Sequence, residues 1–243
     1  MLVAILLLTL AGAAPARAMG PRWQIFSSSI PTNLPPGGEG KVFVSVTNIG
    51  DGSVNAAITP VTITDVLPPG LTPVSIASHT FVQGLEQGSE GTPCSLSPMP
   101  TCTFSGPEPF EPALDVLGPL DGIMELNITV KVEKPLGTVA SLPNEVRVEG
   151  GGIPPKSVAR TVTVNGAETQ FGIEQYEFIP ENEDGSTDTQ AGSHPFQLTS
   201  TLGLNTTFGS GFEGPAALPK DLHVALPPGL VGNPGAVPQC TSV

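Results

Sequence analysis

Charged and aromatic residues are both scarce in this chain of 243 residues. Charged residues make up 13% of it, roughly half the usual share, and only nine residues are Lys or Arg, which leaves a net charge of −13. Nucleic acid and anionic lipid headgroups both need clusters of basic side chains, so the composition argues against either partner. Aromatic residues are 5% of the chain, with one Trp and one Tyr, which is too few for the ring stacks on which sugars pack.

Sequence motifs of catalysis and of metal or nucleotide binding are missing as well. There is no nucleophile elbow, His-Glu-x-x-His pair, phosphate loop or dinucleotide fingerprint. The three histidines, His79, His194 and His223, are never paired at the spacing of metal ligands. We therefore predict a protein that is not an enzyme, with no catalytic, cofactor-binding or metal site and no cofactor.

Helical periodicity is also absent beyond the N-terminus, and the chain has short apolar runs instead. Its 29 Gly and 28 Pro lie between these runs, as turn residues do. The clearest strand is residues 124–133, where Met124, Leu126 and Ile128 begin a strict alternation with polar residues. The other strands predicted in this region are 23–30, 41–48, 58–66, 71–81, 144–149 and 157–165. The pattern predicts an all-β fold, with an immunoglobulin-like β-sandwich over residues 19–166.

A repeated pentapeptide indicates a second domain. Leu-Pro-Pro-Gly-Leu occurs at residues 67–71 and again at 226–230, each time after an alternating segment. The two prolines stop a strand from extending its ladder, and the glycine permits a turn. The second copy follows alternating segments at 196–204 and 222–226. A repeated corner predicts a repeated domain, so we expect a truncated second β-sandwich module over residues 191–243, after an acidic linker at 167–190.

The N-terminus predicts export. Residues 2–10 are apolar, and Ala16-Arg-Ala18 places small residues where a signal peptidase cuts. We predict a signal peptide over residues 1–18, an extracellular or cell-surface location, and no membrane insertion of the mature chain. No Lys or Arg precedes the apolar run. The signal is therefore either incomplete at its start or atypical, and the alternative to a signal is that translation begins at Met19. A transmembrane helix needs about 20 apolar residues, more than this run has.

The three cysteines indicate one local disulfide. Cys94 and Cys102 lie eight residues apart, in a region over 83–112 that we predict to be a loop. In an exported protein this spacing predicts a disulfide, and the lack of a Cys-x-x-Cys pair or nearby His argues against zinc. Cys240 has no partner in this count. Since it also follows closely on the second pentapeptide, we expect the chain to be part of a longer protein.

An acidic run at residues 181–188 is the main candidate for a cation site. Its carboxylate and amide oxygens suit calcium, and Gly185 allows a sharp turn. The EF-hand pattern is not met, so a solvated linker is the favoured interpretation. A calcium-dependent adhesin is kept as an alternative.

Residues 33–165 resemble the bacterial conserved-repeat domain known as domain of unknown function 11. The matching features are a Gly-rich start, residues 42–48 with their Asn-x-Gly turn, residues 62–65 leading into the first pentapeptide, and the closing residues 144–148. The region from residue 189 to Cys240 looks like a module of very large exported actinobacterial proteins. The first resemblance implies an immunoglobulin-like module of an envelope or secreted protein, with no catalytic residues to carry over.

These observations favour a non-enzymatic structural or adhesive module, which serves as a spacer or stalk segment of a larger exported protein. Its expected partners are neighbouring repeat modules or cell-surface components. An accessory region of a larger secreted enzyme is the other alternative.

Overall fold

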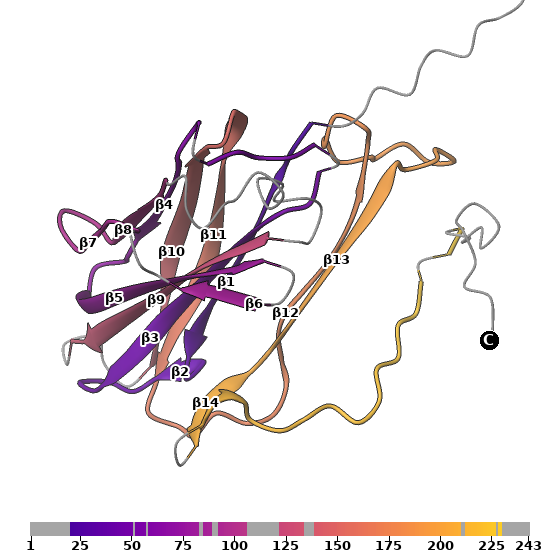
Figure 1. Ribbon diagram of the computed structural model, residues 1–243. Coiled ribbons are helices and arrows are strands. Elements are labelled where there is room, and N and C mark those ends of the chain that lie inside the picture. Colours follow the sequence, from indigo (N-terminus) through magenta and orange to yellow (C-terminus); the bar gives the residue numbers. More distant parts are fainter. Residues whose placement is uncertain are drawn as a thin grey trace, which may run out of the picture.

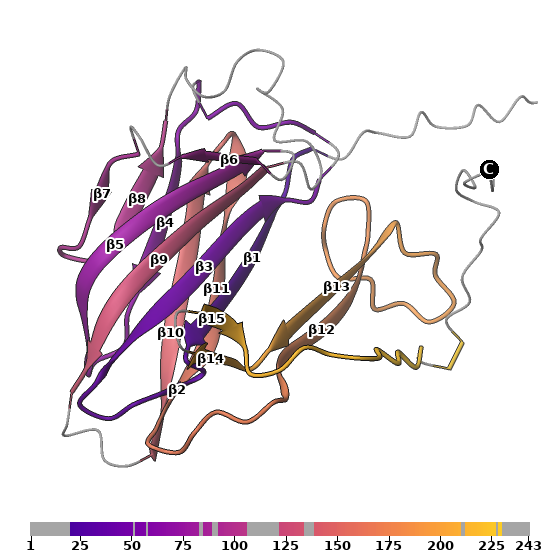
Figure 2. The same ribbon diagram turned by 60° about the horizontal axis from the view of Figure 1, so that its bottom comes forward.

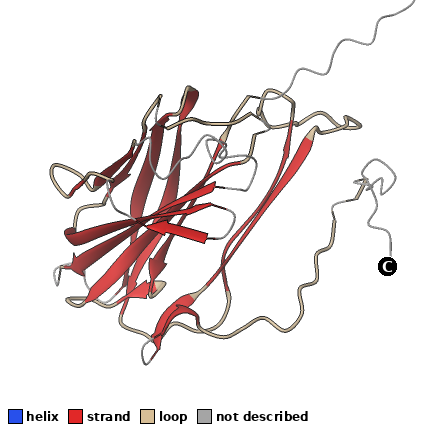
Figure 3. Ribbon diagram, in the orientation of Figure 1, coloured by secondary structure: helices blue, strands red, loops and turns tan. Residues whose placement is uncertain are grey.

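The computed structural model describes residues 20–226, except for 51, 57, 83–84, 89–91, 106–121, 134–138 and 210–211, together with residues 228–229. Every regular element in this part of the chain is a strand, as Figure 3 shows, which confirms the predicted all-β class. No helix among the described residues has the length and apolar character to cross a bilayer. The predicted signal peptide and Cys240 both lie outside the described residues.

Two facing sheets form a β-sandwich (Figures 1 and 2). The strands of the first sheet, in spatial order, are β1 (Trp23–Ile30), β3 (Glu39–Asn48), β9 (Gly122–Val132), β5 (Leu71–Val82) and β6 (Leu85–Gly88). Those of the second sheet are β2 (Asn33–Leu34), β11 (Ile153–Asn165), β10 (Val139–Gly150), β4 (Val61–Val66), β8 (Thr101–Phe104) and β7 (Cys94–Ser95). All neighbouring strands are antiparallel except β2 and β11.

The core of the sandwich follows from alternation along the strands. In β9, Met124, Leu126 and Ile128 are fully buried, as their period of two predicts. Val42, Val44 and Val46 of β3 face the same core. The second sheet contributes residues of β4, β8, β10 and β11, among them Ile63, Phe104, Val146 and Val164.

The first Leu-Pro-Pro-Gly-Leu is the corner at which the chain leaves one sheet for the other. It joins β4, in the second sheet, to β5, in the first. Gly70 has a φ of 97°, and Gly229 in the second copy has a φ of 92°. This left-handed backbone is one that glycine adopts without strain. The glycines of the two copies therefore share a left-handed φ.

Two hairpins lie beside the sandwich, on the side of β1 (Figures 1 and 2). The longer one pairs β12 (Ile173–Glu181) with β13 (Gln197–Leu204), and the shorter one pairs β14 (Thr206–Gly209) with β15 (Phe212–Pro215). We call the β12–β13 pair the long hairpin. It reaches the sandwich through side chains described below.

Three local predictions differ from the structure. Region 83–112 contains β6, β7 and β8 in place of a single loop, because short runs such as Thr101–Phe104 bury alternate residues despite their Pro- and Ser-rich surroundings. The acidic segment 167–190 contains β12, a strand of mixed apolar and acidic residues that pairs with β13. Residues 222–226 form no strand, because no described strand pairs with them.

Candidate functional site

The predicted disulfide joins Cys94 and Cys102. The two residues face each other in the register of β7 and β8, with their Cα atoms 4.1 Å apart. Cys102 is buried in the core, whereas Cys94 is exposed. The bond therefore ties a two-residue edge strand to a strand that belongs to the core.

The three histidines considered as possible metal ligands lie on different parts of the fold. His79 lies on β5 beside Phe81, with ring centroids 6.5 Å apart. His194 is in the connection between β12 and β13, and His223 is in the extended segment after β15. Among the described residues no three His, Cys, Asp or Glu side chains lie close enough to hold a metal ion.

The acidic run folds into a turn that uses its own carboxylates. Asp184 accepts hydrogen bonds from the backbone N–H of Ser186 at 2.9 Å and from the hydroxyl of Ser186 at 2.5 Å. These bonds hold the pKa of Asp184 below its usual value. Asp188 accepts from the N–H of Gln190 and from the hydroxyl of Ser193. Both carboxylates therefore take part in forming the turn.

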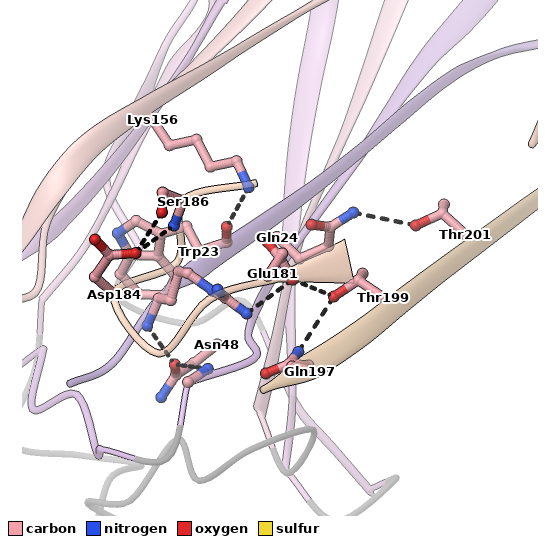
Figure 4. A network of polar contacts seen from close by, with 12 residues as sticks. Trp23, Gln24, Asn48, Lys156, Glu181, Asp184, Ser186, Gln197, Thr199 and Thr201 are labelled. Carbon is pink, nitrogen blue, oxygen red and sulfur yellow. Dashed lines mark hydrogen bonds and ion pairs between the residues drawn. The ribbon is translucent and has the colours of Figure 1, made fainter. Parts of the chain in front are cut away.

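The first acid of the run, Glu181, forms the centre of a contact between the long hairpin and the sandwich (Figure 4). Its Oε2 lies 3.0 Å from Nη2 of Arg22, and it also accepts a 2.6 Å hydrogen bond from the hydroxyl of Thr199. The side chains of Arg22 and Glu181 are only 14% and 7% exposed. Because the two residues are 159 positions apart, the pair fastens distant parts of the chain.

Backbone geometry makes room for this ion pair. Arg22 directly precedes β1, and its backbone N–H donates to Oδ1 of Asn48 at 2.9 Å. Gly185 has a φ of 80°, and a Cβ atom there would lie 2.9 Å from Nη1 of Arg22. A residue with a side chain would be strained at this φ and would press on the guanidinium. The turn of the acidic run is thus shaped to cover Arg22.

Further polar contacts continue along the same junction. Gln24 donates from Nε2 to the hydroxyl of Thr201 at 3.1 Å. Arg160 of β11 forms a 2.7 Å ion pair with Glu177 of β12. The shorter hairpin is attached by Lys41 and Glu213 at 2.6 Å, and by the backbone N–H of Thr32, which donates to the carbonyl of Thr206 at 3.0 Å.

Burial at the junction shifts two pKa values. Lys156 of β11 donates from Nζ to the carbonyl of Trp23 at 2.9 Å, and burial lowers the pKa of its ammonium group. Burial raises the pKa of Glu174 to about 7, against a weak opposing effect of its hydrogen bond from Thr32. Both groups are therefore easier to neutralise than they would be in water.

The contacts show that the long hairpin presents its polar face to the sandwich. Apolar residues alternate along 196–204, and two of them, Leu198 and Leu202, are 44% and 37% exposed. Thr199 and Thr201 alternate with them: Thr201 accepts a hydrogen bond from Gln24 of the sandwich, and Thr199 donates to Glu181, the partner of Arg22. The predicted strand over residues 196–204 is confirmed as β13, and ion pairs and hydrogen bonds hold the polar face of the hairpin against the sandwich.

A cleft of about 390 Å³ opens at this junction. Its walls are residues 20–23, 153–156 and 183–185, so it holds Arg22 and Lys156 opposite Glu183 and Asp184. None of these lining residues is a Ser, Thr, Cys or His. The lining therefore lacks the usual pairing of a hydroxyl or thiol nucleophile with an imidazole base.

Comparisons with known proteins bear on the fold. No family model matches the chain, and no curated protein matches it. BcpA, the major pilin subunit of Bacillus cereus, is 13% identical with a TM-score of 0.44, over 82% of this chain and 65% of the pilin. Domains D2 and D3 of the major pilin SpaD from Corynebacterium diphtheriae are 12% identical with a TM-score of 0.39, over 62% of this chain and 53% of that one.

A third solved structure is ACE19, the collagen binding subdomain of the Enterococcus faecalis surface protein ACE. It is 11% identical with a TM-score of 0.38, over 58% of this chain and 96% of that one. The chain thus spans slightly less than two thirds of the BcpA structure. Similarity at this level supports no conclusion about this chain, and the resemblance to domain of unknown function 11 stays a prediction.

Proposed function

We propose that the chain is a non-enzymatic structural segment of a larger extracellular or cell-envelope protein, in which it acts as a stiff spacer. The observation that carries this proposal is the junction between the sandwich and the long hairpin. A connection that only linked two modules would be polar and exposed, whereas this one contains a buried ion pair and a set of hydrogen bonds.

The contacts are spread along the junction, and this spacing limits rotation. Glu181 is held at the end of β12, and Glu177 is held four residues earlier on the same strand. The shorter hairpin is attached through Thr206. Single surface ion pairs stabilise by less than about 1 kcal/mol. All of these contacts must break before the hairpin can move relative to the sandwich, so together they resist bending.

We also propose where one module ends and the next begins. The sandwich closes with β11 at Asn165, and β12 pairs only with β13. We assign the boundary to residues near 167 and count β12 with the second unit, which places the start of that unit before residue 191. The repeated pentapeptide corner supports the view that the second unit is related to the first.

Export through the predicted signal peptide at residues 1–18 is part of the same proposal. Two features support it: the Cys94–Cys102 disulfide, which suits an oxidising compartment, and the strongly acidic composition with few Lys and Arg. The partners we propose are neighbouring modules of the same protein or other components of the cell surface.

Small-angle scattering of the mature chain tests the spacer. We expect one conformation, with the hairpin fixed on the sandwich, to fit the wild-type curve. The double variant Arg22→Ala/Arg160→Ala removes both ion pairs and should need an ensemble of hairpin positions. A wild-type curve that itself requires such an ensemble would contradict the proposal. Antibody labelling of intact cells tests the location, and labelling only after lysis would contradict export.

A further inference from the structure

Two polar side chains meet inside the largely apolar core of the sandwich. Asp65 is the last inward-facing residue of β4, and Asn144 lies on the adjacent strand β10. Both residues are fully buried. Nδ2 of Asn144 donates a hydrogen bond to Oδ2 of Asp65 at 3.1 Å. This single bond connects residues that are 79 positions apart.

One oxygen of each side chain has no donor. Oδ1 of Asp65 and Oδ1 of Asn144 are both buried, and neither has a hydrogen-bond partner. Buried acceptors are nearly always satisfied in folded proteins. An ionised Asp65 could not satisfy either oxygen, because a carboxylate and an amide oxygen are both acceptors. One additional proton between the two side chains would satisfy both.

Charged groups on the packed strands do not neutralise Asp65. Arg160 of β11 lies across from Asn144 in the strand register, but it forms an ion pair with Glu177 of the long hairpin. The described residues of β9 that face the core are apolar. The charged residues of β10, on its opposite face, are Glu145, Arg147 and Glu149.

We propose that Asp65 keeps its proton in the folded protein and donates it from Oδ1 to Oδ1 of Asn144, which closes a ring of two hydrogen bonds between a carboxylic acid and an amide. The proton moves to no other group, and no bond between heavy atoms changes. Burial raises the pKa of Asp65 to about 7, and the hydrogen bond from Asn144 opposes this only in part.

The ring makes the core more stable in acid than in mild base. The pKa of Asp65 is near 7 in the folded chain and 3.8 in the unfolded chain, so between these values the folded state binds more protons. Stability contributed by the ring is present below pH 3.8 and falls as the pH rises toward 7. From pH 5 to pH 8 this one group should increase the unfolding equilibrium constant about a hundred-fold.

The experiment compares Asp65→Asn with the parent protein in urea unfolding from pH 5 to pH 8. Both proteins carry Glu174→Gln, because burial also raises the pKa of Glu174 to about 7. An amide at position 65 can donate to Asn144 and accept from it, so it rebuilds the ring without a titrating proton. We expect the hundred-fold change in the parent, a much flatter profile in Asp65→Asn, and a more stable variant at pH 8.

An NMR titration of the Asp65 13Cγ shift in the wild-type chain gives a second readout that needs no variant to fold. A midpoint near 7 supports the ring. A midpoint near the ordinary carboxyl value of about 4 overturns it, as does a variant that loses the same stability at every pH.

Discussion

At the scale of the residue, the buried pair of Arg22 and Glu181 is the contact on which the attachment of the long hairpin most depends. Removing one partner of a buried ion pair leaves the other as an uncompensated charge, which is far more damaging than losing an exposed pair. Arg147 and Glu145 offer the comparison within this chain, since their pair at 2.9 Å lies on an exposed face of β10. Both are Arg–Glu ion pairs, so the two pairs differ in burial and not in chemistry.

We expect Arg22→Ala to destabilise the docked hairpin by about 3 kcal/mol, because Glu181 would lose its cation. Amide hydrogen exchange of β12 and β13 measures this directly, as faster exchange at residues that pair across the hairpin. The matched control is Arg147→Ala, which should leave exchange in the hairpin unchanged. Equal effects of the two variants would show that the buried pair has no special role in docking.

At the scale of the element, β9 is the central strand of the first sheet and contributes to the core along its whole length. It lies between β3 and β5 in the middle of the first sheet, and alternate side chains along its whole length are buried. This is also the element that the sequence specifies best, since strict alternation over ten residues has no other comparable interpretation. A strand with this position has neighbours on both sides and above its inner face, so each buried residue contributes packing.

Leu126→Ala should lower the free energy of unfolding by about 2–5 kcal/mol, the usual range for a large-to-small change in a packed core. Asn127→Ala is the matched control, because the neighbouring side chain points away from the core. Chemical denaturation of both variants tests the assignment of the two faces. If Asn127→Ala proved as damaging as Leu126→Ala, the register of β9 would be wrong.

Some features of the fold follow from the sequence and others do not, and the difference lies in how far apart the interacting residues are. The face of β3 with Val42, Val44 and Val46 is a local pattern, and the short spacing of Cys94 and Cys102 is equally local. The ion pair between residues 22 and 181 has no local signal. Neither does the contact of Asp65 with Asn144, because alternation predicts that a residue faces the core without saying which residue it meets there.

At the scale of the whole molecule, the long hairpin has its two faces reversed relative to a strand of the sandwich. Its polar face is attached to the sandwich, and its apolar face carries exposed residues on both strands, including Tyr176, Leu198 and Leu202. Beside it lies the segment with Leu222 and Val224, and together they line a cavity of about 200 Å³. Local alternation therefore could not decide the orientation that the interface imposed.

This arrangement predicts that Leu202→Ser costs little, about 0.5 kcal/mol, because the side chain is already in contact with water. Thr199→Val on the opposite face should be more harmful, because it removes the hydroxyl that donates to Glu181. Thermal denaturation of the two variants tests the orientation. A larger loss for Leu202→Ser would mean that the apolar face is the buried one.

The outermost strands of the second sheet are short, and this affects aggregation between copies of the protein. A long, free sheet edge offers a row of unpaired N–H and C=O groups, to which another chain can add. Here the sheet ends on one side in β2 and on the other in β7, each only two residues long, and the disulfide fixes β7 in place. On the β7 side few backbone groups remain as a template for an added strand, because β8 is itself only four residues long. On the other side β2 covers only Thr163 and Val164 of β11, so among the described strands residues 153–162 of β11 have no partner there. Copies of this protein held close together should therefore resist aggregation through the β7 edge and be more prone to pair through β11.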